Sequence, residues 1–375
     1  MKFVIFADRS YNYIKPLANG LQKKLIELGH SSEVFYDGIY WLSNLNLLKL
    51  FFVDIYRLFL NAQHRQKDLF LYRFFNLLFF FSEKKKRILN ECDCIIVVNN
   101  CPGAFIKCKR LDYLREKFNK PIVNYDFHYL PNQGWWKYMY KDHLGLEQYD
   151  WYLPVGLVTE FAIPPQIPEI YTCIGMDINS DDLYPQQNVF TVLLDFPRPR
   201  HEKLRSEEKK VLDELRINYI ELNGRYTTKQ IRLIYRKTSV YLVSFRESFG
   251  LPIVELQQCG AKIFTPYAEW VPAHYLNKSN KKNTIGTLGS NFVVYKNIEG
   301  LKTALKKEKE KFKAEENVKN FKEEYPLYDR ISDIQFDLFV SMIKDGRITN
   351  RSHENYKKYN DFISKDDDYC KSDRI

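Results

Sequence analysis

The sequence lacks an apolar run long enough to cross a bilayer. A spanning helix needs about 20 successive apolar residues, and charged residues such as Lys49 and Arg57 interrupt the most apolar stretch, residues 40–87. The short apolar stretch 2–7 predicts a strand rather than a signal sequence. We therefore expect a cytoplasmic protein without a membrane-spanning helix.

Cysteine is scarce and follows no metal-binding pattern. The 7 cysteines are an odd number, and the spacing of Cys92, Cys94, Cys101 and Cys108 fits no common zinc site. Cys94 also opens an apolar stretch, as a buried residue would. The sequence therefore predicts free, buried thiols and no metal site.

Length and charge narrow the class of protein. With 375 residues, of which 45% are hydrophobic, the chain can form two domains that each bury a core. The net charge of +10 favours an anionic partner, which could be nucleic acid, an anionic membrane surface or a phosphorylated substrate. Charge alone does not choose among these three.

The first half of the chain has the pattern of a parallel α/β domain. Residues 2–7, 13–28 and 33–36 predict a strand, an amphipathic helix and a second strand, which is a βαβ opening. Two further apolar stretches, 94–99 and 121–125, predict buried parallel strands, with a helix over 110–118 between them.

Residues 40–87 are unusually aromatic and end in the basic run Lys84 to Arg87. Aromatic amphipathic helices with cationic borders suit a membrane interface, because the apolar face inserts while the cations meet anionic lipid. The alternative is that these aromatic side chains cover the first sheet. We expect core packing for most of them and leave a peripheral contact with anionic membrane open for the rest.

The chain is organised around residues 244–260. The apolar run 240–243 predicts a buried strand, and the segment after Gly250 predicts a helix with Pro252 in its first turn. The free amides of such a turn form an anion site. Glu247 precedes this turn and Glu255 follows it on the helix.

This pattern resembles a glycosyltransferase signature. Two glutamates separated by seven residues, with Phe-Gly-Leu-Pro between them and Cys-Gly after them, are similar to the signature of the retaining nucleotide-sugar glycosyltransferases of family four, the glycosyl transferases group 1. The resemblance implies an α/β protein with the GT-B fold, in which two Rossmann-like domains with parallel sheets face a central cleft. It covers residues 189–266 best.

The resemblance also implies roles for individual residues. Glu247 would steady the hydroxyls of the donor sugar and Glu255 would bind the ribose. The departing diphosphate would be stabilised by the amides of the signature turn and by two cations five positions apart. The residues concerned are Phe249, Gly250, Leu251, Arg198 and Lys203, with Arg200 as a competing cation.

Other positions depart from the family pattern or match it only in part. His128 follows a predicted strand, where relatives place a histidine near the donor sugar, although a surface histidine is equally expected there. Gly224 would lie near the nucleotide base. The glycines that relatives carry after the first strand are absent from residues 8–12. The loop 267–274 also departs from the family pattern, and Glu269, Trp270 and His274 are its candidates for specificity.

The predicted domains follow from these matches. Residues 1–187 would bind the acceptor and include a linker over 174–187, and residues 188–325 would bind the nucleotide sugar. Residues 326–346 would form a closing helix that crosses back to the first domain. A polar, flexible tail would occupy residues 347–375.

The function implied is transfer of a sugar, with retention of configuration, from a UDP- or GDP-sugar without a metal cofactor. The acceptor would be a glycan or a lipid-linked glycan in cell-surface polysaccharide or lipopolysaccharide assembly. One alternative is a DNA-modifying glucosyltransferase that acts on modified bases, since its cleft would also be cationic. The other is an inactive nucleotide- or carbohydrate-binding protein.

Overall fold

The chain forms two compact units. Unit 1 comprises residues 1–155, 167–179 and 331–375, and unit 2 comprises residues 156–166 and 180–330. The computed structural model describes residues 1–7, 14–36, 83–98, 109–126, 149–156, 171–178, 181–198, 201–243, 247, 249–266, 272–277 and 287–352.

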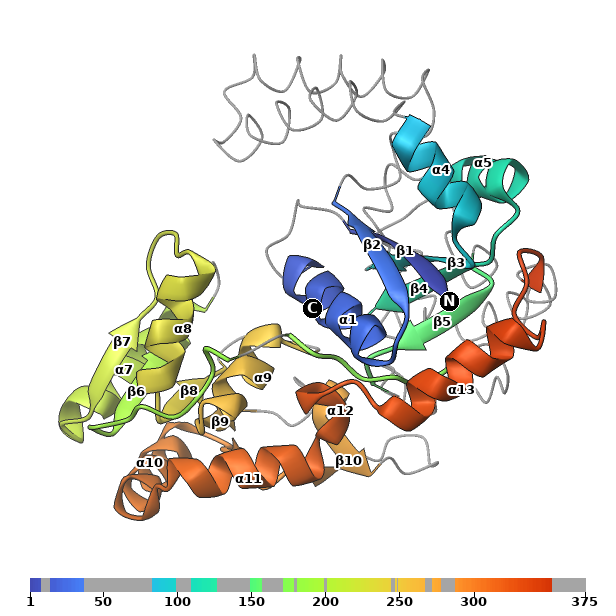
Figure 1. Cartoon of the computed structure of the whole chain (residues 1–375). Helices are drawn as coiled ribbons and strands as arrows, with labels where there is room; N and C mark the ends of the chain where they lie inside the picture. The colour runs from blue at the N-terminus through green and yellow to red at the C-terminus, as the bar shows by residue number, and fades with distance from the viewer. Residues whose placement is uncertain are drawn as a thin grey trace, which may run out of the picture. The chain divides into compact units, whose positions relative to one another are not determined.

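Unit 1 contains a five-stranded parallel sheet in the order β2-β1-β3-β4-β5 (Figure 1). Every residue of β3 is buried, as expected of a strand with neighbours on both sides and helices on both faces. The strand–helix–strand opening is confirmed, as are the two later strands and their helix. The elements are β1 (Lys2–Phe6), α1 (Ile14–Glu27), β2 (Ser31–Phe35), α4 (Glu83–Glu91), β3 (Cys94–Val98), α5 (Lys109–Phe118), β4 (Ile122–Asp126) and β5 (Trp151–Pro154).

Unit 2 contains a second five-stranded parallel sheet, in the order β12-β9-β8-β6-β7. α7 contacts α10, and α8 contacts α9. Right-handed crossovers place the first pair on one face of the sheet and the second pair on the other. The elements are β6 (Thr191–Leu194), α7 (Glu202–Glu214), β7 (Asn218–Glu221), α8 (Thr228–Lys237), β8 (Val240–Leu242), α9 (Leu251–Gln258), β9 (Lys262–Thr265), β12 (Phe292–Val294), α10 (Ile298–Lys311) and α11 (Ala314–Glu324).

Both sheets are built as Rossmann-like parallel α/β layers, which confirms the predicted fold class. In unit 2 the buried core joins strand residues such as Val192 and Leu242 to Leu212 of α7 and to Leu301 of α10. A short 3-10 turn (Pro272–His274) and an antiparallel pair, β10 (Tyr275–Asn277) and β11 (Thr287–Leu288), lie between β9 and β12.

The boundary between the units differs from the predicted one. It lies after residue 179 rather than near residue 188. Residues of the expected linker are bound to unit 2: the Gln186 amide donates to the Arg236 carbonyl at 2.8 Å, and the Gln187 side chain donates to the carbonyls of Thr238 and Cys259 at 2.7 Å.

The predicted closing helix is two helices. α12 (Pro326–Asp329) belongs to unit 2 and α13 (Asp333–Lys344) to unit 1. The Ser332 amide donates to the Ile174 carbonyl at 2.8 Å, and the Phe339 ring lies 6.4 Å from the ring of Phe3. α13 therefore completes the core of the first unit.

The tail does not begin at residue 347. Ile348 is 2% exposed, and the Arg115 side chain donates to the Asn350 carbonyl at 3.2 Å. Arg115 also pairs with the buried Asp150. Residues 347–352 are therefore packed on unit 1, and residues 353–375 lie outside the described part.

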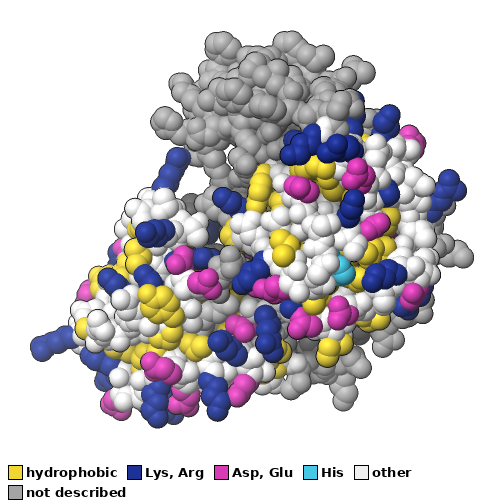
Figure 2. Space-filling model, in the orientation of Figure 1, with side chains coloured by type: hydrophobic (Ala, Val, Ile, Leu, Met, Phe, Trp, Pro, Cys, Tyr) yellow, Lys and Arg dark blue, Asp and Glu magenta, His cyan; other side chains and the backbone are white. Residues whose placement is uncertain are grey.

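Within the described residues, no helix is long and apolar enough to span a membrane. The aromatic residues 40–82 lie outside that part, so the choice between core packing and membrane contact stays open. Figure 2 shows Lys and Arg side chains gathered at the start of α4, which begins with the basic run Lys84 to Arg87.

The cysteines that the structure describes, Cys92, Cys94, Cys173 and Cys259, are free and buried, as the sequence predicts. Burial raises the pKa of Cys92, Cys173 and Cys259 to about 12. Cys101 and Cys108 lie outside the described residues.

Candidate functional site

The candidate site lies at the carboxyl ends of β6 and β8 in unit 2. These strands are neighbours, yet the chain leaves β6 toward β7 on one side and leaves β8 toward β9 on the other. Such a switch in direction opens a crevice at the carboxyl edge of a parallel sheet, where ligands bind. The segments that follow the two strands carry Arg198 and Glu247.

The start of α9 is shaped by Gly250. This residue is the N-cap, with φ of 67° and ψ of 90°, a left-handed conformation that glycine adopts without strain. A Cβ atom there would lie 2.7 Å from the Cγ of Glu247 and 2.8 Å from the Cδ1 of Ile253. Glycine therefore lets the Glu247 side chain lie directly against the turn.

The first amides of α9 are suited to an anion. Among the described residues, the N–H groups of Gly250 and Leu251 donate no hydrogen bond, and Pro252 has none to donate. Unpaired amides at a helix N-terminus carry partial positive charge. The turn therefore offers two donors beside the half-buried Glu247.

The carbonyl of Phe249 faces the opposite way, into the unit. It accepts a hydrogen bond from His274 Nε2 at 2.7 Å, and the two rings stack with centroids 5.7 Å apart. His274 is fully buried among Phe249, Phe292, Tyr325 and Tyr328. It therefore supports the signature turn from inside, through the Phe249 carbonyl.

Glu255 is paired with an arginine. Arg232 of α8 donates to Glu255 Oε1 through Nε at 3.1 Å and through Nη2 at 2.9 Å. Glu255 is 7% exposed and Arg232 is 6% exposed. Burial raises the pKa of Glu255, and the charge and hydrogen bonds of Arg232 act in the opposite direction.

Asp195 is the first residue after β6. It is buried, and this burial raises its pKa. The pKa of Tyr241 is raised by its own burial, and Asp195 and Glu247 add to that shift. Two acids, Asp195 after β6 and Glu247 after β8, thus act on Tyr241.

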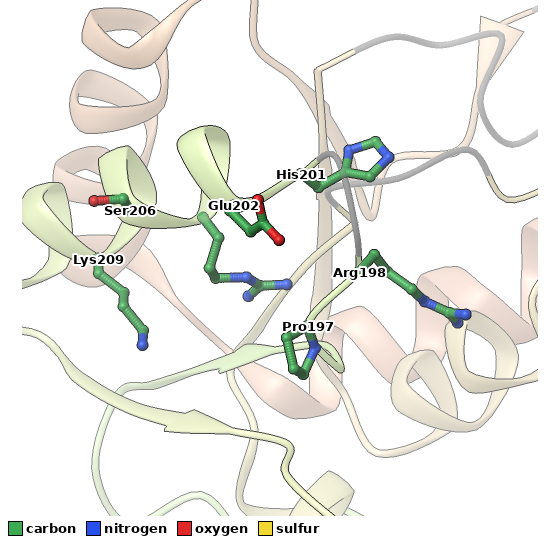
Figure 3. A pocket seen from close by; sticks show the side chains of 7 residues that line it. Pro197, Arg198, His201, Glu202, Ser206 and Lys209 are labelled. Carbon is green, nitrogen blue, oxygen red and sulfur yellow. The ribbon is translucent and has the colours of Figure 1, made fainter.

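A pocket of about 250 Å³ lies between the segment after β6 and the first turns of α7. Figure 3 shows Glu202, Ser206 and Lys209 in succession along α7, with Arg198 extending from the loop before it. The nearly buried Arg205 also lines the pocket and forms a 3.8 Å ion pair with Glu208. Lys209 pairs with Glu221. The pocket thus combines three cations with nearby acids.

Comparison with known proteins gave matches in structure only. No protein-family model and no curated protein matches the sequence. The solved structures it resembles include sucrose-phosphate synthase from Thermosynechococcus elongatus, with TM-score 0.49 and 12% identity over 92% of this chain and 98% of that one. S. aureus MnaA with UDP has TM-score 0.46 and 11% identity over 92% and 96% of the two chains.

A third match is restricted to one domain. The C-terminal domain of a glycosyl transferase group 1 family protein (LpcC) from Francisella tularensis matches with TM-score 0.27 and 14% identity over 39% of this chain and 93% of that one. The fold assignment rests on the two five-stranded parallel sheets of this chain.

The structure brings some predicted site residues together. Phe249, Gly250 and Leu251 form the signature turn with Glu247 against it, and Glu255 lies about 7 Å further along the helix axis. Gly224 follows β7 in an exposed turn with φ of 81° and open space around it. His128 and Arg200 lie outside the described residues.

The two predicted cations are placed differently. Arg198 lines the pocket beside α7, whereas Lys203 is exposed and does not line it. Glu202, Arg205, Ser206 and Lys209 recur at helical spacing on one face of α7, and Lys203 falls outside that series. Helical periodicity alone could have identified Arg205 and Lys209, which the sequence analysis missed.

Proposed function

We propose that the protein is a retaining glycosyltransferase that uses a nucleotide sugar, a UDP- or GDP-sugar, and needs no metal. The observation that carries the proposal is the signature turn at the β6/β8 switch point. There, Glu247 lies against Gly250, two helix amides are unpaired among the described residues, and Glu255 is held on the same helix.

Each group has a role in the proposed reaction. The bond between the anomeric carbon and the diphosphate oxygen breaks, and its electron pair leaves with the diphosphate. The amides of Gly250 and Leu251, with Arg198 and Lys203, would stabilise that growing negative charge. Glu247 would hold the sugar hydroxyls, and Glu255 would accept hydrogen bonds from the ribose.

The proposed transfer takes place on a single face of the sugar, which also assigns the proton. The acceptor hydroxyl forms the new bond on the face that the diphosphate leaves, and its proton passes to the departing phosphate oxygen. Neither step consumes a metal ion or an oxidant. Among the parts of the chain with described positions, no three His, Cys, Asp or Glu side chains are grouped to hold a metal ion.

The proposed acceptor is a glycan or lipid-linked glycan at an anionic membrane, as in cell-surface polysaccharide or lipopolysaccharide assembly. The basic start of α4 supports this choice, because successive cations attract anionic lipid headgroups. Flotation with phosphatidylglycerol vesicles, compared with phosphatidylcholine vesicles, tests the contact. Binding to DNA with a steep salt dependence and no vesicle binding would favour the DNA-modifying alternative instead.

The donor is tested by thermal shift with UDP, GDP, ADP, CMP and their common sugar conjugates. A ligand at about 100 times its dissociation constant adds about 2.7 kcal/mol of stability. We expect one base to give a clear shift that Glu255→Ala removes and that Glu316→Ala, an exposed control on α11, preserves. No shift with any nucleotide would refute the proposal.

Retention is tested separately on the sugar released to water. Proton NMR recorded before mutarotation reports the configuration of the first product. The anomer of the donor is expected, and the opposite anomer would exclude a retaining mechanism while leaving glycosyl transfer intact.

A further inference from the structure

Glu255 is held on one side only. Both hydrogen bonds from Arg232 end on Oε1, at 3.1 Å and 2.9 Å. Among the residues with described positions, Oε2 receives no hydrogen bond. A carboxylate oxygen has two lone pairs, so Oε2 can accept two hydroxyl hydrogen bonds at once.

Arg232 is itself fixed in place. It belongs to α8, whose first turn is locked by the Thr227–Gln230 capping box, in which each side chain bonds the backbone of the other. Its third nitrogen, Nη1, lies 3.9 Å from Asp182 Oδ2. Arg232 is 6% exposed, so solvent screens its pair with Glu255 weakly.

We infer that Arg232 is a positioning residue that holds Glu255 ionised and oriented, with Oε2 presented to a vicinal diol such as that of a ribose. The inference rests on the proposed function, and it names the group that allows a nearly buried glutamate to act as an acceptor. An ionised carboxylate accepts hydrogen bonds from both hydroxyls, whereas a protonated one loses part of that capacity and affinity.

The titratable and charged groups around Glu255 come from two helices and one preceding segment. Arg232 and Tyr235 face it from α8, Cys259 lies beyond it at the end of α9, and Asp182 lies on the far side of Arg232. Arg236, also on α8, acts on Cys259. Of these groups, Arg232 alone hydrogen-bonds the carboxylate among the described residues.

Removal of Arg232 should therefore make the affinity for a diol depend on the protonation of Glu255. Burial already raises the pKa of Glu255, and Arg232 opposes that shift. Without the arginine the pKa rises further, so the neutral form becomes populated at higher pH. Affinity for a diol then falls roughly tenfold per pH unit below that pKa, until the residual affinity of the neutral form is reached.

The experiment measures dissociation constants of UDP, GDP and ADP by calorimetry from pH 5.5 to pH 8.5. For the nucleotide that binds, we expect Arg232→Gln to shift the decline in affinity toward higher pH. Arg232→Lys, which keeps the charge, should shift it less. Glu255→Gln should bind weakly with no dependence on this titration. Loss of the 2′-hydroxyl from the nucleotide should weaken binding to the wild-type protein more than to Glu255→Gln.

Arg236→Gln is the matched control, because it removes the same charge from the same helix without contacting Glu255. Its pH profile should match that of the wild-type protein. If Arg232→Gln lowers the melting temperature but keeps the wild-type pH profile, Arg232 is merely structural and the inference is overturned. If the wild-type protein binds none of the three nucleotides at any pH, the proposed function fails instead. Arg232→Lys keeps the test open if Arg232→Gln does not fold.

Discussion

The Nε2 atom of His274 lies 2.7 Å from the carbonyl oxygen of Phe249, inside a fully buried cluster of aromatic rings. Because a carbonyl only accepts, Nε2 must carry the proton in the neutral ring. The other nitrogen, Nδ1, is buried and has no hydrogen-bond partner among the described residues. A histidine that contacts no solvent thus sets the orientation of the signature turn.

His274 should make stability depend on pH. Burial lowers its pKa to about 4, compared with roughly 6.5 in the unfolded chain. Between these values the unfolded state binds more protons than the folded state, so stability falls as pH drops from 6.5 toward 4, by roughly 3 kcal/mol in total. Urea unfolding at several pH values in this window measures the slope.

His274→Gln is the informative variant, since its amide can donate to the Phe249 carbonyl but cannot titrate. The variant should lose the part of the slope that His274 contributes. An unchanged slope between pH 4 and pH 6.5 would show that the buried imidazole does not titrate there. His274→Ala removes the donor as well and should also weaken nucleotide binding, because the turn loses its internal support.

Gly250→Ala should destabilise unit 2 and weaken donor binding. A left-handed conformation costs a non-glycine residue about 1–2 kcal/mol, and the new Cβ would also meet Glu247 and Ile253 within 3 Å. Gly224→Ala is the matched control, since Gly224 also has a positive φ but open space around it. Urea unfolding should show a larger loss for Gly250→Ala, and equal losses would argue against the close contact with Glu247.

The sequence was sufficient where structure depends on neighbours along the chain. The apolar stretches became parallel strands, and Thr227 and Gln230, three positions apart, form a capping box at the start of α8. Both depend on spacings of a few residues, which a sequence displays directly. The start of a helix directly after Gly250, with Pro252 in its first turn, belongs to the same class.

Contacts between distant segments could not be predicted in this way. Arg232 and Glu255 are 23 residues apart and meet only because α8 and α9 pack on one face of the sheet. His274 and Phe249 are 25 residues apart, with α9 and β9 between them in the sequence. The sequence therefore predicted a role for Glu255 but not the arginine that pairs with it.

The buried thiols should resist alkylation in the folded protein. Cys92, Cys173 and Cys259 have pKa values raised by burial to about 12, so little reactive thiolate exists at pH 8. Iodoacetamide labelling followed by peptide mass spectrometry should find them unmodified in buffer and modified in concentrated guanidinium chloride. Rapid labelling of Cys259 in buffer would mean that the end of α9 opens in the native state.

The two cations proposed for the diphosphate should contribute unequally. Arg198 lines the pocket at the start of α7, and Lys203 is exposed outside it. Hydrogen bonds to charged groups contribute about 1.5–3 kcal/mol, so Arg198→Gln should weaken binding of the nucleoside diphosphate roughly tenfold or more. Lys203→Gln should weaken it less, because solvent screens an exposed lysine. Calorimetry with the diphosphate and the monophosphate separates this effect from base recognition.

Lys209→Gln supplies the matched control for that comparison. Lys209 lines the same pocket but already pairs with Glu221, so its removal should change diphosphate affinity by less than about threefold. The affinity for the nucleoside monophosphate should change little in any of the three variants, because the monophosphate lacks the second phosphate. If Lys209→Gln costs as much affinity as Arg198→Gln, the diphosphate lies deeper along α7 than the signature turn. The assignment of its charge to Arg198 and the amides of α9 would then be wrong.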